Sequence, residues 1–160
     1  MKILISLFFL LITTSSFAVT FDGKFIQGSF ILGKTEPGSE VFIDKKKVKV
    51  TPDGYFVFGL GRDRKNDIVI TINEKKIIKK VFKREYKIQR IDGLEEKKVT
   101  PPEEVYERIK RENKWIGETR AINSDLTFFK NKFAIPVKNA IITGVYGSQR
   151  ILNGKPKWPH

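Results

Sequence analysis

Residues 37–60, PGSEVFIDKKKVKVTPDGYFVFGL, decide the fold of this protein. Two short runs, EVFID and KVKV, flank a lysine-rich turn, Asp44-Lys45-Lys46-Lys47, and the run YFVFG follows Thr51-Pro52-Asp53-Gly54. Proline presets φ and glycine accepts positive φ, so this second tetrapeptide predicts a turn between strands. The stretch therefore predicts three short strands joined by two turns.

The same pattern continues on both sides of this stretch. FIQGSFILG precedes it with a period-two alternation, and DIVITI, a turn at Asn73-Glu74 and residues 77–90 follow it. Short strands with turns every eight to twelve residues indicate a β-sandwich over residues 19–92. Residues 37–60 also resemble the hairpin pattern of small immunoglobulin-like domains of the carboxypeptidase-regulatory type, which implies an immunoglobulin-like form of that sandwich.

The composition excludes several classes of protein. The chain has 160 residues, of which 40% are hydrophobic and 12% aromatic, so it has enough apolar side chains for a core and wholesale disorder is not expected. It has no cysteine, which excludes a disulfide framework, a thiolate zinc site and a cysteine nucleophile.

The N-terminus has the pattern of a cleaved secretory signal over residues 1–18. Lys2 is followed by an apolar run from Ile3 to Ile12, a polar stretch, and a small-x-small cleavage site that ends at Ala18. The run is shorter than the about 20 residues that span a bilayer, although an uncleaved N-terminal anchor is the alternative. We expect a periplasmic or secreted protein with no stable membrane anchor after cleavage.

The charge is strongly basic, with 31 Lys and Arg against 18 Asp and Glu and a formal net charge of +13. Export and the lack of a basic stripe interleaved with aromatic residues argue against nucleic acid as a partner. An exported basic protein can instead meet anionic polymers of the cell envelope, and many of the lysines are expected in solvated turns.

Residues 93–125 are expected to form a linker and a connecting helix. Residues 91–102, IDGLEEKKVTPP, are rich in charges and turn formers. Thr100 and Pro101 then predict an N-cap and first helical position, with Glu103 three residues after the cap. Along the helix that follows, Val105, Ile109 and Ile116 predict one narrow face packed on a neighbouring domain. The pairs Glu104–Arg108 and Glu107–Arg111 have supporting i,i+4 spacing.

From Leu126 the pattern is again that of β-structure, and we expect residues 126–160 to be the truncated start of a second, β-rich domain. No Gly-x-Ser-x-Gly elbow, HExxH helix or phosphate loop is present, and GLGR at residues 59–62 lacks the third glycine of a dinucleotide fingerprint. His160 is the one histidine of the chain. By itself it is either a zinc ligand or an ordinary exposed residue, because one ligand does not hold zinc.

The stretch ITGVYGSQRILNGKPKWPH at residues 142–160 resembles the opening motif of the lysostaphin-type (LytM-like) zinc metallopeptidases of bacterial cell walls. Stretches upstream, among them DGYFVFG and YKIQRIDGL, are similar to the N-terminal portion of exported members of that family. The motif residues matched here are Gly144, Tyr146, Gly147, Arg150, Asn153, Gly154 and His160.

The resemblance implies that residues 126–160 are the truncated start of a β-rich catalytic domain and that His160 is its first zinc ligand. Arg150, Asn153 and Tyr146 are candidates for orienting the site or lining the substrate groove, although Arg150 and Asn153 could equally cap turns. The family's aspartate ligand and its His-x-His are absent from residues 1–160, so zinc belongs to the full-length protein only and this fragment has no catalytic residue of its own.

The function implied is that of a zinc metalloendopeptidase that hydrolyses the peptide cross-links of peptidoglycan, with this chain as its inactive N-terminal fragment. Two alternatives stay open. One is a non-enzymatic homologue that regulates other wall hydrolases. The other is a free-standing envelope-binding β-domain.

Overall fold

The computed structural model describes residues 18–131 and 133–159. The predicted secretory signal falls almost entirely outside these residues. The strands are β1 (Thr20–Asp22), β2 (Phe30–Lys34), β3 (Val41–Ile43), β4 (Lys46–Val48), β5 (Tyr55–Gly59), β6 (Ile68–Ile72), β7 (Lys75–Lys79), β8 (Ile88–Ile91), β9 (Gln149–Leu152) and β10 (Lys155–Pro156). The α-helices are α1 (Glu96–Val99) and α2 (Tyr106–Ala121), with 3₁₀ turns at Glu103–Val105 and Phe128–Lys130.

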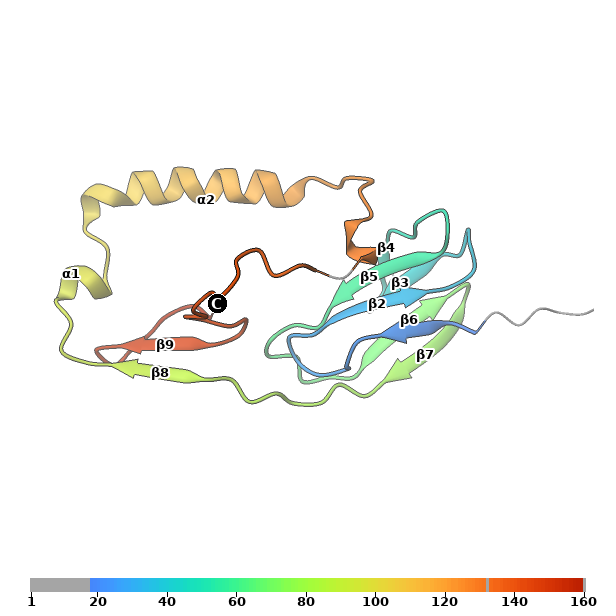
Figure 1. The fold of residues 1–160 in the computed structure, drawn as a ribbon, viewed down its shortest axis with the longest axis horizontal. Coiled ribbons are helices and arrows are strands. Elements are labelled where there is room, and N and C mark those ends of the chain that lie inside the picture. The colour runs from blue at the N-terminus through green and yellow to red at the C-terminus, as the bar shows by residue number, and fades with distance from the viewer. Residues whose placement is uncertain (1–17, 132, 160) are drawn as a thin grey trace, which may run out of the picture.

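The protein is mainly β, as the sequence predicted. Strands β1 to β7 form two antiparallel sheets, one in the order β1-β2-β5 and one in the order β4-β3-β6-β7. The two sheets lie together at one end of the molecule (Figure 1). We call them the two-sheet unit.

One apolar cluster is shared by both sheets of this unit. Phe56 from β5 and Ile70 from β6 are both fully buried, and the burial alternates along both strands. Gly33 on β2 lets the Phe56 ring approach, because a Cβ at position 33 would lie 2.2 Å from that ring. The buried members of the cluster are Ile31, Val41, Phe56, Phe58, Leu60, Ile68, Ile70 and Ile72.

The turns predicted in and after the central stretch are confirmed, although the lysine-rich turn is shorter than predicted, because Lys46 and Lys47 belong to β4. Asp44 and Lys45 connect β3 to β4 with φ values of 47° and 72°, and Asn73 and Glu74 connect β6 to β7 with 44° and 71°. Two successive positive φ values define the tight hairpin turn whose twist matches that of the flanking strands. Before β5, the Gly54 N–H donates to the Thr51 carbonyl at 2.9 Å.

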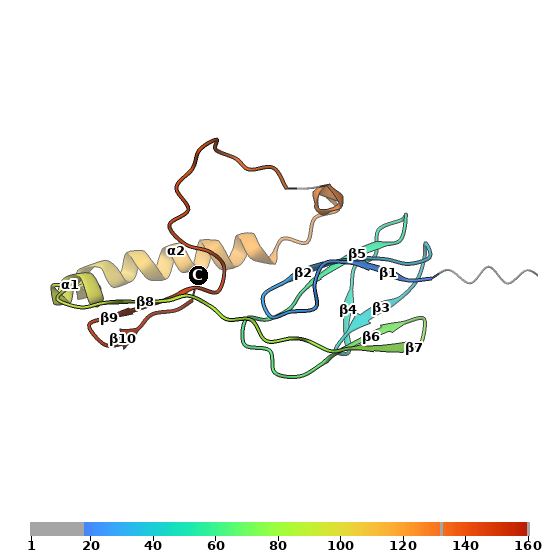
Figure 2. The same ribbon diagram turned by 60° about the horizontal axis from the view of Figure 1, so that its bottom comes forward.

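A third, smaller sheet has the order β10-β9-β8 and lies apart from the two-sheet unit (Figures 1 and 2). Its β9 and β10 are antiparallel, whereas β8 and β9 are parallel, with Ile88 opposite Gln149 and Ile91 opposite Leu152. The sequence pattern grouped residues 88–91 with the preceding β-region. In the structure they leave that region and pair with the C-terminal segment.

The connection after β8 differs from its prediction. The stretch expected to be a linker contains the single-turn helix α1, and Thr100 is the residue that ends α1. Its backbone N–H donates to the Glu96 carbonyl at 2.8 Å, and its hydroxyl lies 2.9 Å from the Glu96 carboxylate. The prediction of Thr100 as the N-cap of the long helix was therefore wrong, because its hydrogen bonds are used one turn earlier.

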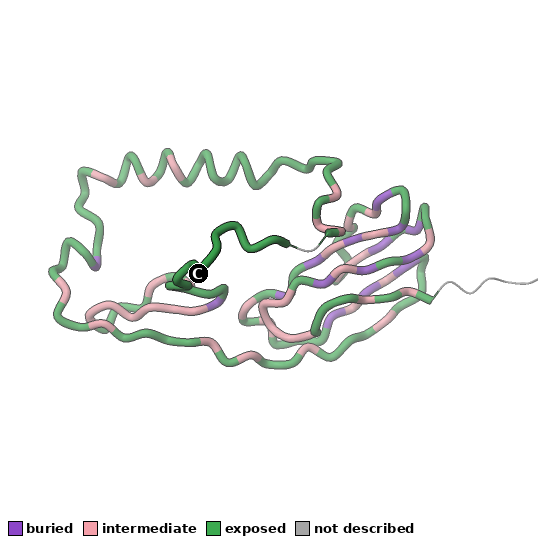
Figure 3. The backbone as a smooth tube through the Cα atoms, in the orientation of Figure 1, coloured by how far each residue is buried: buried purple, intermediate pink, exposed green. Residues whose placement is uncertain are grey.

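Helix α2 runs from the side of the third sheet back toward the two-sheet unit, and no residue of it is buried (Figures 1 and 3). The expected narrow packed face is not formed in the described part of the chain, and Ile116 is exposed. The surface ion pairs recorded along the helix are Arg108–Glu112 and Lys114–Glu118, with the basic residue first, rather than the two predicted pairs.

Residues 122–131 lie against the two-sheet unit, and residues 133–146 lead from there toward β9 (Figure 1). Both stretches are largely without regular structure, so the β-runs expected here are not formed where the chain is described. Lys130 makes an ion pair of 2.7 Å with Asp53, and Phe133 lies edge-on to Phe30 with ring centroids 6.1 Å apart. Across residues 18–131 and 133–159, no helix combines the length and the apolar character that a membrane span requires.

Candidate functional site

The motif at residues 142–160 forms a hairpin. Strands β9 and β10 are joined by Asn153 and Gly154, which have φ values of 46° and 76°. This is again the pair of positive φ values of a tight hairpin turn, which asparagine and glycine adopt readily. The backbone conformation of this turn therefore explains why asparagine and glycine occupy positions 153 and 154 of the motif.

Gly147 also has a conformational role, in the turn before β9. Its φ is 83°, and a Cβ at this position would lie 2.1 Å from the ring of Tyr86. The turn is closed by the N–H of Ser148, which donates to the Val145 carbonyl at 3.0 Å. Only glycine meets both requirements, the left-handed backbone and the close approach of an aromatic ring.

Asn153 lies at the hairpin turn, and its side chain points to the segment before α1. The side-chain Oδ1 accepts the Leu94 N–H at 3.0 Å, and Nδ2 donates to the Leu94 carbonyl at 2.6 Å. The Asn153 N–H donates to the Ile91 carbonyl at 2.9 Å. Asn153 thus joins the hairpin to residues 91–94, in addition to shaping the turn.

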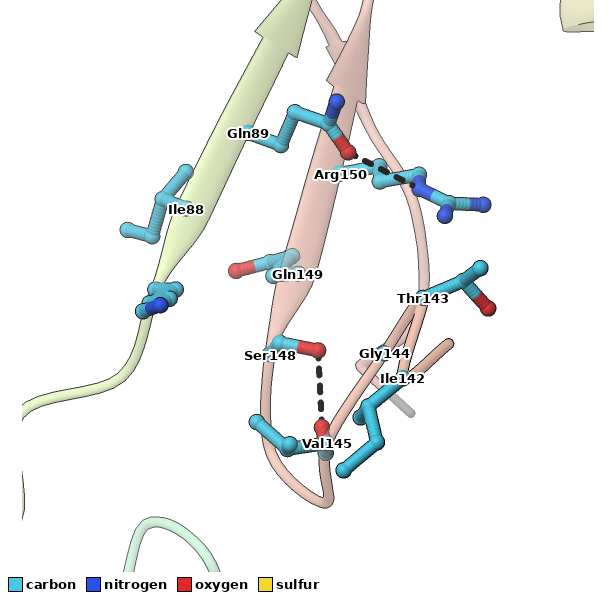
Figure 4. A pocket seen from close by; sticks show the side chains of 10 residues that line it. Ile88, Gln89, Ile142, Thr143, Gly144, Val145, Ser148, Gln149 and Arg150 are labelled. Atoms are coloured by element: carbon cyan, nitrogen blue, oxygen red, sulfur yellow. Dashed lines mark hydrogen bonds between the residues drawn. The ribbon is translucent and has the colours of Figure 1, made fainter. Parts of the chain in front are cut away.

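Arg150 lies on β9, and its Nε donates to Oε1 of Gln89 on β8 at 3.2 Å (Figure 4). The two side chains line an open pocket of about 630 Å³ together with Ile142, Thr143 and Val145. Tyr146 is exposed, and its ring lies against Gly28 of the two-sheet unit, where a Cβ would be 2.9 Å from it. Among the described residues, no hydrogen bond joins the side chain of Arg150 or Tyr146 to Asn153.

Residues 94–99 hold the other strand of the hairpin. The ammonium group of Lys155 on β10 lies 2.5 Å from the Glu96 carboxylate, and the Lys157 ammonium donates to the carbonyl of the buried residue Val99. Hydrogen bonds from Lys155 and from Thr100 lower the pKa of Glu96 below its ordinary value. This contact was not predicted from the sequence, because charged and turn-forming residues indicate only a linker.

Two hydrogen bonds direct the chain beyond β10. The Lys157 N–H donates to the Arg150 carbonyl at 2.8 Å, and the Gln149 side-chain amide donates to the Lys157 carbonyl at 2.8 Å. They position Trp158 and Pro159, the residues directly before His160. The side chain of Trp158 is 93% exposed.

The two-sheet unit contacts the hairpin through Arg62 and Tyr86. The Arg62 Nε donates to the Gly147 carbonyl at 2.7 Å, and its guanidinium lies 4.6 Å from the centre of the Tyr86 ring. The Tyr86 hydroxyl donates to the Arg62 carbonyl at 3.3 Å. Partial burial raises the pKa of Tyr86 above its ordinary value. Arg62 ends the GLGR stretch and Tyr86 begins YKIQRIDGL, but neither stretch predicted a contact with residues 142–160.

His160, the predicted zinc ligand, lies outside the described residues, and Ala18, at the predicted cleavage site, is exposed. Within residues 18–131 and 133–159, no three histidine, cysteine, aspartate or glutamate residues gather as a metal site would require. The described residues therefore do not provide a zinc site by themselves.

No protein-family model matches the chain, and the search of curated proteins found no significant match to it.

Proposed function

We propose that this chain is the N-terminal part of an exported zinc metalloendopeptidase that hydrolyses peptide cross-links of peptidoglycan. One observation carries the proposal. Residues 142–160 resemble the opening motif of the lysostaphin-type peptidases, and three of the matched residues, Gly147, Asn153 and Gly154, have positive φ values. A motif whose glycine and asparagine positions have positive φ values supports the resemblance more strongly than the same residues in a loop without such φ values would.

His160 is the zinc ligand in this proposal, four residues after the end of β10. The other ligands would come from a Gly-x-Asp directly after His160 and a later His-x-His. When bound, zinc supplies Lewis-acid polarisation of a carbonyl and an activated water. The contribution of the described residues is to hold the hairpin, through Leu94, Val99 and Arg62, and so to direct the chain that follows β10.

The proposal includes an immunoglobulin-like β-sandwich for the N-terminal domain. Its support is the single apolar cluster that the two antiparallel sheets share. The domain would position or shield the catalytic domain. It would do so in the periplasm or outside the cell, after removal of residues 1–18.

The decisive experiment starts with the gene. The reading frame is followed past codon 160, and the complete product is expressed, loaded with zinc and incubated with purified peptidoglycan. We expect cross-linked muropeptides to be converted to un-cross-linked ones, as measured by liquid chromatography with mass spectrometry. The His160→Ala variant should lose this activity, and the matched surface variant Lys138→Ala should retain it.

A frame that continues without Gly-x-Asp and His-x-His would overturn the peptidase proposal in favour of a non-enzymatic regulator of wall hydrolases. A stop codon at position 161 would overturn it in favour of an envelope-binding β-domain. A complete ligand set whose product leaves every cross-link intact would also contradict it.

A further inference from the structure

A basic groove lies where the two-sheet unit meets the third sheet. Its volume is about 710 Å³, and its walls are the loop after β5 and the connection between β7 and β8. Figure 1 shows this connection as the extended segment that joins the two parts of the molecule. Two acidic residues, Asp63 and Glu85, line the groove. The cationic residues that line it are Arg62, Arg64, Lys65, Lys83 and Arg84.

Two of these cations serve the structure. The Arg64 guanidinium makes two hydrogen bonds with the Asp44 carboxylate, at 2.5 and 3.1 Å, and this contact lowers the pKa of Asp44. Arg62 is bonded to the Gly147 carbonyl and paired with Asp63 at 2.6 Å. These two side chains shape the groove and have little capacity left for a ligand.

The other three cations form a separate group. Lys65, Lys83 and Arg84 take part in none of the ion pairs found among the described residues. The Arg84 guanidinium lies 5.5 Å from the centre of the Tyr86 ring, on which Arg62 also lies at 4.6 Å. The contact with the ring orients Arg84 without neutralising its charge. The groove therefore presents three cations outside any of these ion pairs against the single carboxylate of Glu85, which leaves an excess of positive charge.

The basic groove continues toward the end of the hairpin. A second groove of about 320 Å³ shares Arg62 and Asp63 with it and is lined further by Lys157, Trp158 and Pro159. The exposed Trp158 offers an apolar surface with one hydrogen-bond donor beside this path. Together the two grooves form one path, which leads from Lys65, Lys83 and Arg84 to Pro159, the residue before His160.

We propose that this path binds peptidoglycan strands, with Lys65, Lys83 and Arg84 contacting the free carboxylates of stem peptides and Trp158 packing against the strand. The inference rests on the proposed function and adds a substrate-binding role for the N-terminal part. Cations spaced along an open groove attract a polyanion and favour binding that weakens with salt. Bound in this way, a strand would lie along the path that ends beside position 160.

The test is co-sedimentation of the full chain with purified peptidoglycan sacculi at low ionic strength. The groove variant Lys65→Glu/Lys83→Glu/Arg84→Glu is compared with a matched control, Lys46→Glu/Lys75→Glu/Lys76→Glu, which makes the same change of net charge on exposed positions of β4 and β7. Circular dichroism verifies that both variants fold. We expect about tenfold or greater loss of affinity in the groove variant and a much smaller change in the control.

Chemical amidation of the carboxylates on the sacculi should abolish binding of the unchanged chain, and Trp158→Ala should weaken it. Equal losses in the groove and control variants would overturn the proposal, because net charge alone would then explain the binding. Undiminished binding to amidated sacculi would also overturn it. Stronger binding to vesicles of anionic phospholipid than to sacculi would replace it with a membrane-surface site.

The readout is binding and not hydrolysis, so the two proposals fail separately. If binding depends on the groove but the complete product leaves cross-links intact, the peptidase proposal is overturned and the groove proposal stands. If the complete product hydrolyses cross-links and the three groove substitutions change neither its binding nor its rate, the groove proposal is overturned and the peptidase proposal stands.

Discussion

The side-chain amide of Asn153 makes both of its hydrogen bonds to one residue, accepting from the N–H of Leu94 and donating to its carbonyl. The two residues are 59 positions apart in the chain. This contact joins the hairpin turn to the segment before α1. Together with the hydrogen bond from Lys157 to the Val99 carbonyl, it holds the β9–β10 hairpin against residues 94–99. It is the clearest case of a motif residue whose role depends on a distant part of the chain.

Replacing Asn153 by aspartate tests this contact. The carboxylate keeps the acceptor but removes the donor to the Leu94 carbonyl, so we expect a loss of about 1–3 kcal/mol in the free energy of opening the hairpin. Hydrogen exchange at the Leu94 amide, followed by NMR, measures it. Asn139→Asp is the control, because Asn139 also has a positive φ of 57° and is exposed. Equal exchange rates in the two variants would contradict the role of Asn153.

Gly147→Ala should disrupt the contact between the two-sheet unit and the hairpin. The substitution places a methyl group 2.1 Å from the Tyr86 ring in addition to straining a residue with positive φ. Gly93→Ala is the matched control, since Gly93 has a φ of 76° and a methyl group there would have no heavy atom within 4 Å. We expect Gly93→Ala to lose about 1–2 kcal/mol through strain alone. Gly147→Ala should lose roughly 1–3 kcal/mol more through overpacking.

Urea unfolding measures both glycine variants. The second substitution Tyr86→Ser, which removes the ring, should recover most of the additional loss in Gly147→Ala. A double variant no more stable than Gly147→Ala alone would show that the ring is not the cause.

Phe56→Ala should strongly destabilise the two-sheet unit. The ring is fully buried at the centre of the shared apolar cluster, so we expect a loss of about 3–5 kcal/mol in the free energy of unfolding. Phe133→Ala removes the same ring from a position that is 78% exposed and should change stability little. Urea titration followed by circular dichroism distinguishes the two, and similar midpoints would place the core elsewhere.

Asp53 should titrate abnormally. Hydrogen bonds from Lys130 and from Thr51 lower its pKa from the ordinary value of 3.8 to about 2. A depressed pKa stabilises the folded state above the unfolded-state value, and this contribution is lost as the pH falls through about 2. Lys130→Met should raise the NMR titration midpoint of the Asp53 carboxyl, whereas Lys138→Met should leave it unchanged. An unshifted midpoint in Lys130→Met would show that the ion pair is not formed.

The 160-residue chain should bind zinc only weakly. A single histidine cannot hold zinc with the affinity of a three-ligand site, and the described residues offer no other cluster. Isothermal calorimetry should show no tight stoichiometric binding, and His160→Ala should behave like the unchanged chain. Tight one-to-one binding would mean that this chain already contains a complete site.

The strands and turns of the two-sheet unit could be predicted because their signals are local. Asp44-Lys45, Asn73-Glu74 and Thr51-Pro52-Asp53-Gly54 each lie between apolar runs. The backbone angles that a tight turn requires depend on the residues of the turn itself. The alternation of buried and exposed residues along β5 and β6 likewise follows from the period of a strand.

The candidate site could be predicted only in part. The resemblance of residues 142–160 singled out Gly147, Asn153 and Gly154, and all three have demanding backbone angles. Tyr86 and Leu94 begin and end the stretch YKIQRIDGL, and Arg62 ends GLGR, but neither stretch predicted that these residues contact the hairpin. The spacing of residues in a sequence does not show which backbone carbonyl or which ring face a distant residue will contact. Helix α2 shows the converse, since its apolar positions suggested a packed face and none of its residues is buried.

The sequence by itself determined where the strands and turns of the two-sheet unit form and that a long helix follows them, since those choices depend on side chains a few residues apart. Tertiary structure decided that β8 leaves its neighbours and pairs in parallel with β9, and that Thr100 ends α1 instead of starting α2. Which strand lies beside which depends on free energy gained between segments about 60 residues apart. The alternation of apolar and polar residues does not reveal this free energy, because it shows which face of a strand is buried and not which strand lies beside it.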